Sequence, residues 1–248
     1  MSLALELHDL LKTYLRRHGV AAITVDTADA WRLDAAFTLP GIGRCRARNV
    51  RKGDVPAFHA FGAGLSERSK DLFSPYPWNE PEKLKGAFQA AIDASVNRVD
   101  AAYFLEMEGE PVGHFFLWKA GGNPHARAHG VEVPELGVAV ADAWQGRGFG
   151  GLMVRILTAV ARSLGADAVE LTTALDNEPG WQTYLRAGYE YTGIIRNPQF
   201  VDVTAVAAGA ATAAVWRDER QMILLLNETK RDAVLHYLAV KREEALKM

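Results

Sequence analysis

The sequence predicts a fold of the α/β class (an α+β mixed sheet), in which helices cover a mixed sheet. Three observations indicate it. From Cys45 onward, apolar runs with the two-residue alternation of strands take turns with segments of helical periodicity. The tripeptide Glu108-Gly109-Glu110 separates two such strands and is typical of a hairpin, so part of the sheet is antiparallel. A glycine-rich loop over residues 146–151 follows one strand and opens into a long helix.

The individual elements follow in chain order. An amphipathic helix is expected over residues 4–17, and two weaker strand patterns follow at 21–27 and 31–39. Strands are then expected over 45–50, 101–107, 111–119, 133–140, 168–173, 189–194 and 221–226, and helices over 54–64, 82–97, 151–164, 179–187 and 229–246. Asp54 and Thr229 suit the N-caps of two of these helices, and Gly165 suits a helix C-terminus.

Length and composition indicate one large domain or a domain with extensions, since 248 residues that are 49% hydrophobic can bury a substantial core. The formal net charge of −2 argues against a general polyanion binder, so we expect no nucleic-acid partner. The best candidate for a membrane span, residues 203–216, is shorter than the roughly 20 residues that a span needs. The single cysteine, Cys45, excludes an intrachain disulfide and fits a reducing compartment. With no signal-peptide pattern at the N-terminus, we expect a cytoplasmic protein without a membrane partner.

The glycine loop has the chemistry of a phosphate-binding site. Glycines let the backbone turn its N–H groups to one side, and the following helix adds unpaired N–H groups and the positive end of its dipole. A lysine-bearing P-loop is excluded because no Gly-Lys-Ser/Thr follows. The dinucleotide fingerprint is formally present as Gly146-x-Gly148-x-x-Gly151, with Glu170 where a ribose-binding acid is expected. That match is weak, because residues 141–145 separate the strand from the first glycine and repeated strand–helix units are missing.

A third pattern fits better. Gln145-x-x-Gly148-x-Gly150, after a strand and at a helix start, resembles the acyl-CoA pyrophosphate loop of the GNAT superfamily of N-acetyltransferases. The strand before the loop, residues 135–140, resembles the corresponding strand of the family, and the order of elements from about residue 45 to 227 agrees. The family's following helix and turn are resembled by Asn177, Tyr184, Gly188 and Tyr189.

The resemblance implies a central mixed, mostly antiparallel sheet flanked by helices. We expect an N-terminal extension with a helix and short strands over residues 1–43, a GNAT-like acyl-CoA-binding catalytic domain over 44–228 and a C-terminal helix over 229–248. The chain departs from the family in that extension and in a long insertion over residues 196–220, before the last strand. Both segments are candidates for the acceptor site or for a homodimer interface.

The family pattern also implies which residues meet the co-substrate acetyl-CoA. The pyrophosphate would sit on the N–H groups of the glycine loop, with a further donor from Gln145. The arm of CoA would meet the backbone of a strand that splays from its neighbour, where an N–H group could stabilise the oxyanion. The expected CoA-binding residues are Val138, Ala139, Val140, Gln145, Gly146, Arg147, Gly148, Phe149, Gly150, Gly151 and Asn177. The alternatives are a fully paired core strand, an ordinary glycine-rich connection and a helix-capping role for Asn177.

Two side chains are candidates for proton transfer. Tyr184 would be the general acid, because the departing CoA thiolate needs a proton and a phenol with a pKa near 10 can supply it. Its alternative role is that of an aromatic side chain packed on the sheet. Glu135 is the candidate general base, acting on the attacking amine through water, and Glu132 is a weaker substitute. The alternative for Glu135 is a solvated or salt-bridged strand residue.

Three further features have simple structural explanations. His125 and His129 have a spacing that metals use on helices, but Pro124 and the flanking glycines argue against a regular helix, so we expect a loop pair and no metal site. Cys45 fits a half-buried strand cysteine better than a reactive thiol. The aromatic loop over residues 73–78 either frames the acceptor or plugs the end of the sheet.

The sequence thus predicts an acyltransferase of the GNAT type, which transfers an acetyl group from acetyl-CoA to a primary amine by direct attack in a ternary complex. The acceptor, a small molecule or a protein amine, is not named by the sequence. A non-catalytic acyl-CoA-binding or sensing module is the alternative. A nicotinamide-dependent oxidoreductase is disfavoured by the long connection before Gly146.

Overall fold

The computed structural model describes residues 2–15, 22–198 and 216–247. The strands are β1 (Ala22–Val25), β2 (Asp34–Leu39), β3 (Gly43–Asn49), β4 (Ala101–Met107), β5 (Glu110–Trp118), β6 (Glu135–Val140), β7 (Ala168–Ala174), β8 (Glu190–Pro198) and β9 (Trp216–Leu225). The helices are α1 (Leu3–Leu15), α2 (Val55–Ala63), α3 (Glu67–Leu72), α4 (Pro81–Val96), α5 (Pro124–Ala128), α6 (Phe149–Ser163), α7 (Glu178–Arg186) and α9 (Arg231–Ala245), with 3₁₀ turns η1 (Asp142–Trp144) and η2 (Glu228–Lys230).

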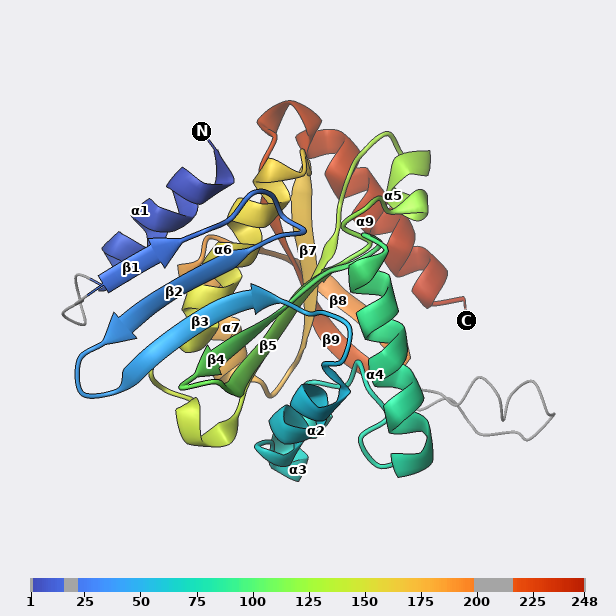
Figure 1. The fold of residues 1–248 in the computed structure, drawn as a ribbon. Helices are drawn as coiled ribbons and strands as arrows, with labels where there is room; N and C mark the ends of the chain where they lie inside the picture. Colours follow the sequence, from blue (N-terminus) through green and yellow to red (C-terminus); the bar gives the residue numbers. More distant parts are fainter. Residues whose placement is uncertain (1, 16–21, 199–215, 248) are drawn as a thin grey trace.

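The nine described strands form one sheet in the order β1-β2-β3-β4-β5-β6-β7-β9-β8 (Figure 1). Neighbouring strands run antiparallel except β6 and β7, which run parallel. The prediction of a mixed, mostly antiparallel sheet flanked by helices is confirmed. The two strands of the N-terminal extension lengthen the sheet at one edge, beside β3.

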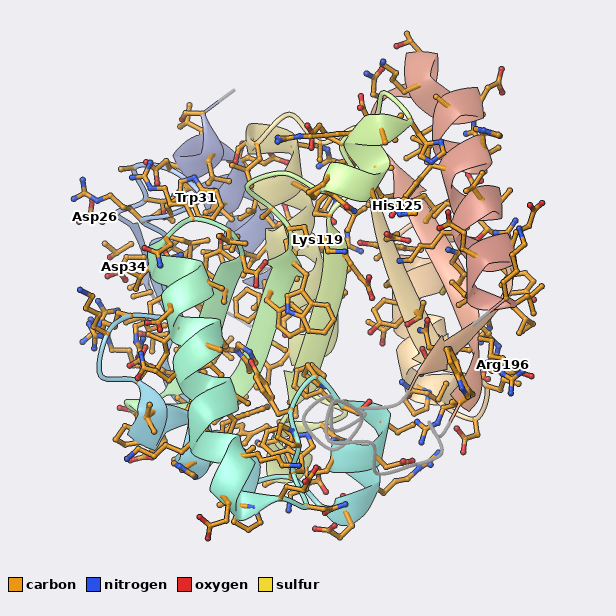
Figure 2. The ribbon with its side chains drawn as sticks, turned by 90° about the vertical axis from the view of Figure 1, so that its right-hand side faces the viewer. Asp26, Trp31, Asp34, Lys119, His125 and Arg196 are labelled. Atoms are coloured by element: carbon orange, nitrogen blue, oxygen red, sulfur yellow. The ribbon has the colours of Figure 1, made fainter. Side chains whose placement is uncertain are left out.

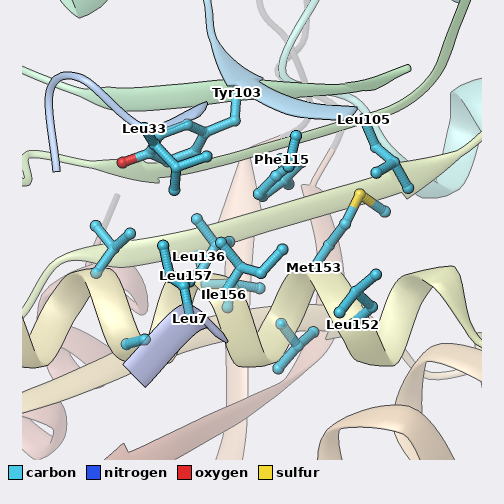
Figure 3. Close-up of a cluster of buried hydrophobic side chains, with 14 of the residues drawn as sticks. Leu7, Leu33, Tyr103, Leu105, Phe115, Leu136, Leu152, Met153, Ile156 and Leu157 are labelled. Carbon is cyan, nitrogen blue, oxygen red and sulfur yellow. The ribbon is translucent and has the colours of Figure 1, made fainter. Parts of the chain in front are cut away.

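One face of the sheet carries α1, α6 and α7. Leu7 and Leu11 of α1 are completely buried and belong to the same apolar cluster as α6 and the sheet. Figure 3 shows side chains of this cluster, Leu7 of α1 and Ile156 and Leu157 of α6 among them. The N-terminal helix is therefore part of the main core, because its apolar stripe is buried against α6 and the sheet.

The opposite face carries α2, α4, α5 and α9. Phe58 and Phe61 of α2 and Phe88 of α4 form an aromatic cluster with strands β4 and β5. Val234 and Tyr237 of α9 pack with α5 on β7 and β9. Figure 2 views this face, on which α4 and α9 stand apart on opposite sides. No helix within the described ranges is long and apolar enough to cross a membrane.

Several element boundaries differ from the expected ones. Strands β8 and β9 reach into the expected insertion, since they pair as far as Pro198 and Trp216, and only residues 199–215 of that segment lie outside the described residues. A short helix, α5, forms where a polar loop was expected, because Asn123 caps it and Pro124 suits its first turn. Thr229 is not the cap of the C-terminal helix, because the side chain of Asn227 accepts its N–H and starts the 3₁₀ turn η2.

Candidate active site

The parallel seam between β6 and β7 opens after a single residue pair. Glu135 of β6 faces Glu170 of β7, and no further pair joins these strands in the described residues, whereas β6 pairs with β5 along its whole length. Ala141 donates its N–H to Val112 of β5, so strand alternation turns the N–H of Val138 toward β7. Strand β6 therefore presents free backbone groups to the space beside β7, and the fully paired alternative does not hold.

The loop between β6 and α6 presents a row of unpaired amide groups. No N–H of residues 146–151 donates to an acceptor in the part of the chain that the structure describes. Gly146 and Gly148 have φ values of 72° and 84°, a region that glycine adopts without strain. Gly148 is also the N-cap of α6, so the positive end of the helix dipole lies here. The loop thus has the donors that an anion requires.

Contacts from α3 hold the start of this loop. Asp142 accepts the N–H of Ser66 at 3.1 Å and the hydroxyl of Ser69 at 2.6 Å. Gln145 directs its side-chain nitrogen to Ser69 Oγ at 3.2 Å and to the carbonyl of Val140 at 3.1 Å. The side-chain amide of Gln145 therefore contacts protein acceptors at the surface and fixes the loop, and its predicted contact with a pyrophosphate stays a prediction.

Residues further along the loop contact α1 and η1. Tyr14 of α1 donates its hydroxyl to the carbonyl oxygen of Arg147 at 3.2 Å. The guanidinium carbon of Arg147 lies 4.7 Å from the ring centroid of Trp144. This stacking keeps an exposed positive charge beside the row of amide groups.

Asn177 begins α7, the helix that lies next to α6. Its Oδ1 atom accepts the N–H of Gly180 at 3.1 Å, and its Nδ2 atom donates to Thr173 Oγ1 of β7 at 3.0 Å. A Cβ atom at position 180 would lie 2.5 Å from Asn177 Nδ2, so only glycine leaves room for this cap. The capping role is filled, and the predicted contact with CoA stays a prediction.

Tyr184 lies on the side of α7 that packs on the sheet, with 8% of the residue exposed. Its ring centroid is 5.9 Å from that of Tyr189. Burial raises the pKa of Tyr184 to about 12, so the phenol is protonated at neutral pH. The side chain therefore fills the alternative packing role, and its role as the general acid stays a prediction.

Glu135 is half-buried and ion-paired. Nζ of Lys241 in α9 lies 3.2 Å from Glu135 Oε2 and 3.0 Å from Glu170 Oε1. Burial opposes the charge of Lys241, but the two carboxylates outweigh it and raise the pKa of the lysine. Glu132, the weaker substitute, forms an ion pair with Arg127 instead. The salt-bridged alternative for Glu135 is thus present in the structure.

Glu170 lies at the bottom of the same charge cluster. It is 1% exposed and accepts the hydroxyl of Tyr237 at 2.7 Å, while its second carboxylate oxygen has no partner among the described residues. A buried acid held by α9 cannot reach the ribose of a dinucleotide. Glu170 is therefore not available as the ribose-binding acid of the dinucleotide alternative.

The other candidates lie away from the seam. Cys45 is completely buried in β3, and burial raises the pKa of its thiol to about 12, so a reactive thiol is the wrong interpretation. The rings of His125 and His129 stack with centroids 5.6 Å apart. Across the described ranges, no group of three or more His, Cys, Asp or Glu side chains is arranged to hold a metal ion.

The aromatic loop over residues 73–78 packs as a plug on the α2–α4 face. Phe73 and Tyr76 are buried in the aromatic cluster, and the Tyr76 hydroxyl lies 2.8 Å from Nε2 of His114. Both aromatic side chains therefore belong to the core. The plug alternative accounts for them.

Sequence reasoning missed three residues of this region: Tyr14, Ser69 and Lys241. Each contacts the site from an element far away in sequence, so the motifs around the glycine loop gave no sign of them. One signal was available for Lys241, because Tyr237 and Lys241 are four residues apart and share one helix face, from which both reach Glu170.

Comparisons with known proteins agree with this geometry. Residues 66–189 match the model of the acetyltransferase (GNAT) family. The chain is 27% identical over 107 residues to the L-amino acid N-acetyltransferase AaaT of Escherichia coli (strain K12), an alignment that covers 41% of this chain. The chain spans 63% of the length of that relative.

Solved structures share the fold. RimJ of Mycobacterium smegmatis, in complex with CoA-disulfide, has a TM-score of 0.51 and 16% identity, with 90% of this chain and 94% of that chain covered. An acetyltransferase of Salmonella typhimurium that modifies the N-terminal serine of ribosomal protein L7/L12 has a TM-score of 0.57 and 14% identity, with 74% and 95% covered. At these identities the likeness shows the fold alone.

Proposed function

The chain belongs to the GNAT family of acetyltransferases, and we propose that it transfers an acetyl group from acetyl-CoA to a primary amine. The observation that supports this proposal is that two sets of unpaired backbone groups follow each other along the chain. The free edge of β6 is followed, after the connection over residues 141–145, by the unpaired N–H groups of residues 146–151. A ligand with a diphosphate and an extended amide-bearing arm matches both sets at once.

Each part of this surface has a task in the proposal. The amide groups of the glycine loop, together with the charge of Arg147, bind the diphosphate. The edge of β6 around Val138 orients the arm and donates an N–H to the acyl carbonyl oxygen. Asn177, fixed by its own cap, adds a polar contact from α7. Acetyl-CoA supplies the activated thioester, and most of the rate enhancement comes from holding it against the amine.

Proton transfer is assigned to Tyr184 and Glu135. The Tyr184 hydroxyl, protonated at neutral pH, gives its proton to the leaving sulfur atom. Glu135 accepts the proton of the attacking amine through water, and Lys241 holds its carboxylate in place.

The acceptor belongs to the class of primary amines. The relatives named above act on free L-amino acids in one case and on a protein N-terminal serine in the other. Both kinds of amine are therefore candidates for this chain. A cytoplasmic location and a homodimer are further proposals from the sequence.

Calorimetric titration with acetyl-CoA, with NAD as the comparison ligand, tests the proposal. Saturable binding of acetyl-CoA alone is expected. Release of the CoA thiol is then followed with a panel of free L-amino acids and of short peptides that begin with serine. No binding of acetyl-CoA, or tighter binding of NAD, would overturn the proposal, and binding without turnover on any amine would favour a non-catalytic module.

A further inference from the structure

We propose that Tyr14 is a positioning residue for CoA, because its hydroxyl holds the peptide between Arg147 and Gly148 so that the Gly148 N–H faces the diphosphate. The inference rests on the proposed function, since it concerns the loop that would bind CoA. Tyr14 lies in the N-terminal extension, the segment in which the chain departs from the family pattern.

The geometry of the peptide group between Arg147 and Gly148 sets the direction of the Gly148 N–H. The hydroxyl of Tyr14 lies 3.2 Å from the carbonyl oxygen of Arg147. In a planar trans peptide the carbonyl oxygen and the following N–H point in opposite directions. A hydrogen bond that draws the Arg147 carbonyl toward α1 therefore turns the Gly148 N–H away from α1, to the outer side of the loop.

The conformation of Gly148 is one in which the neighbouring peptide can change its orientation. Its φ of 84° lies in the left-handed region, where glycine is also free to adopt other backbone angles. A peptide next to such a residue can flip unless something holds it. The contact is also close, because a Cβ atom at position 148 would lie 3.0 Å from the Tyr14 hydroxyl oxygen. Tyr14 thus restricts Gly148, the N-cap of α6.

Tyr14 is itself held in place by the packing of its helix, α1. Helix α1 is fixed to α6 by the buried side chains of Leu7 and Leu11 and by an ion pair of 2.9 Å between Glu6 and Arg162. Tyr14, through α1, and the glycine loop, which leads into α6, are therefore both held in place by the same helix, α6. Burial raises the pKa of Tyr14 to about 12, so the hydroxyl keeps its proton throughout the physiological range.

The role differs from that of a residue that merely stabilises the fold. A preorganised amide donor strengthens the binding of an anion because the loop does not have to be ordered when the ligand arrives. Loss of the hydroxyl leaves the Gly148 peptide free to flip in the absence of CoA. The expected consequence is weaker CoA binding with little change in the unfolding temperature.

The test compares two variants of the same helix. Tyr14→Phe removes the hydroxyl and keeps the ring, whereas Glu6→Gln breaks the ion pair to Arg162 and leaves the loop contact intact. CoA affinity is measured by calorimetry and the unfolding temperature by circular dichroism, for both variants and the wild type. One lost hydrogen bond corresponds to a roughly three- to tenfold rise in Kd.

The expected result is that rise for Tyr14→Phe and a Kd within about twofold of wild type for Glu6→Gln, where no hydrogen bond to the loop is lost. An unchanged Kd in Tyr14→Phe would overturn the inference. Equal weakening in both variants would overturn it as well, because the docking of α1 as a whole would then be responsible. Failure of the wild type to bind CoA would instead remove the proposed function on which the inference rests.

Discussion

Glu135 and Glu170 form the one residue pair that joins the parallel strands β6 and β7 in the described part of the chain. Their carboxylates share Nζ of Lys241, at 3.2 Å and 3.0 Å. Two carboxylates side by side repel each other, so the lysine from α9 compensates both where the strands meet. The pair also marks the point beyond which the strands separate. The charge cluster therefore closes one end of the seam along which we propose that CoA binds.

Replacement of Lys241 by methionine is expected to lower the free energy of unfolding by about 3 kcal/mol, because Glu170 would be left buried without a cation. Urea unfolding at pH 7 measures this. The double variant Lys241→Met with Glu170→Gln should recover at least half of the loss. Lys247→Met, at an exposed position past α9, is the control and should change stability by less than about 0.5 kcal/mol. A double variant no more stable than the single one would contradict the explanation.

Alanine at Gly148 is expected to weaken acetyl-CoA binding at least about tenfold, because the new Cβ disfavours the left-handed conformation and crowds the Tyr14 hydroxyl. Gly165, at the other end of α6, is a matched control, since its φ of 76° is similar and a Cβ atom added there would meet no atom within 4 Å. Both variants should lose about 1–2 kcal/mol of stability. Calorimetry should find weaker binding only for Gly148→Ala, and equal affinities would argue against the loop assignment.

Tyr184→Phe is expected to lower kcat about 100-fold while the Kd for acetyl-CoA changes less than about twofold, because only the proton donor is lost. Tyr189→Phe, at the neighbouring buried ring, should keep most of the activity. Because the pKa of Tyr184 is raised to about 12, deprotonation of this group should leave kcat unchanged at pH values below about 10. Steady-state kinetics of the three proteins test both points, and an undiminished kcat in Tyr184→Phe would remove Tyr184 from the mechanism.

Leu7→Ala is expected to destabilise the protein by about 2–5 kcal/mol, because this side chain of α1 is completely buried in the main core. Leu5→Ala, on the same helix but 60% exposed, should cost less than about 0.5 kcal/mol. Urea unfolding of both variants separates the two cases. Similar stabilities for the two would mean that α1 is not an integral part of the core.

Acid is expected to destabilise the protein through His114. Burial lowers the pKa of this side chain to about 4, whereas the unfolded chain has the usual value near 6.5. Between these pH values the unfolded state binds a proton at His114 and the folded state does not. The free energy of unfolding is therefore highest above pH 6.5 and falls as the pH drops toward 4. Between pH 6.5 and 5 the loss amounts to about 2 kcal/mol.

His114→Gln isolates this contribution. The variant loses the titrating ring, so its free energy of unfolding should fall less between pH 7 and pH 5 than that of the wild type, by about 2 kcal/mol. Urea titrations of both proteins at the two pH values provide the comparison. Identical pH dependence would show that His114 does not titrate between the folded and unfolded states as expected.

Local chemistry explains why much of the fold was predictable. The Glu108-Gly109-Glu110 turn, the strand from Glu135 to Val140 and the glycine loop are each encoded by neighbouring residues, and all appear in the structure. The helix cap at Asn177 is local as well. Boundaries were less predictable: β9 includes residues 216–220, ahead of the expected start at Gln221, because β8 offers them pairing partners, which no local pattern reveals.

The sequence by itself determined the sheet class, the glycine loop at the start of α6 and the residue types around it, because turns, caps and alternation depend on residues a few positions apart. Only the tertiary structure decided that the Gln145 side chain contacts Val140 and Ser69, that Lys241 holds Glu135 and that Tyr14 holds Arg147. These contacts join residues that lie as many as 133 positions apart in the chain. A hydrogen bond or ion pair depends on distance in space, and the packing of α1 and α9 on the sheet sets that distance.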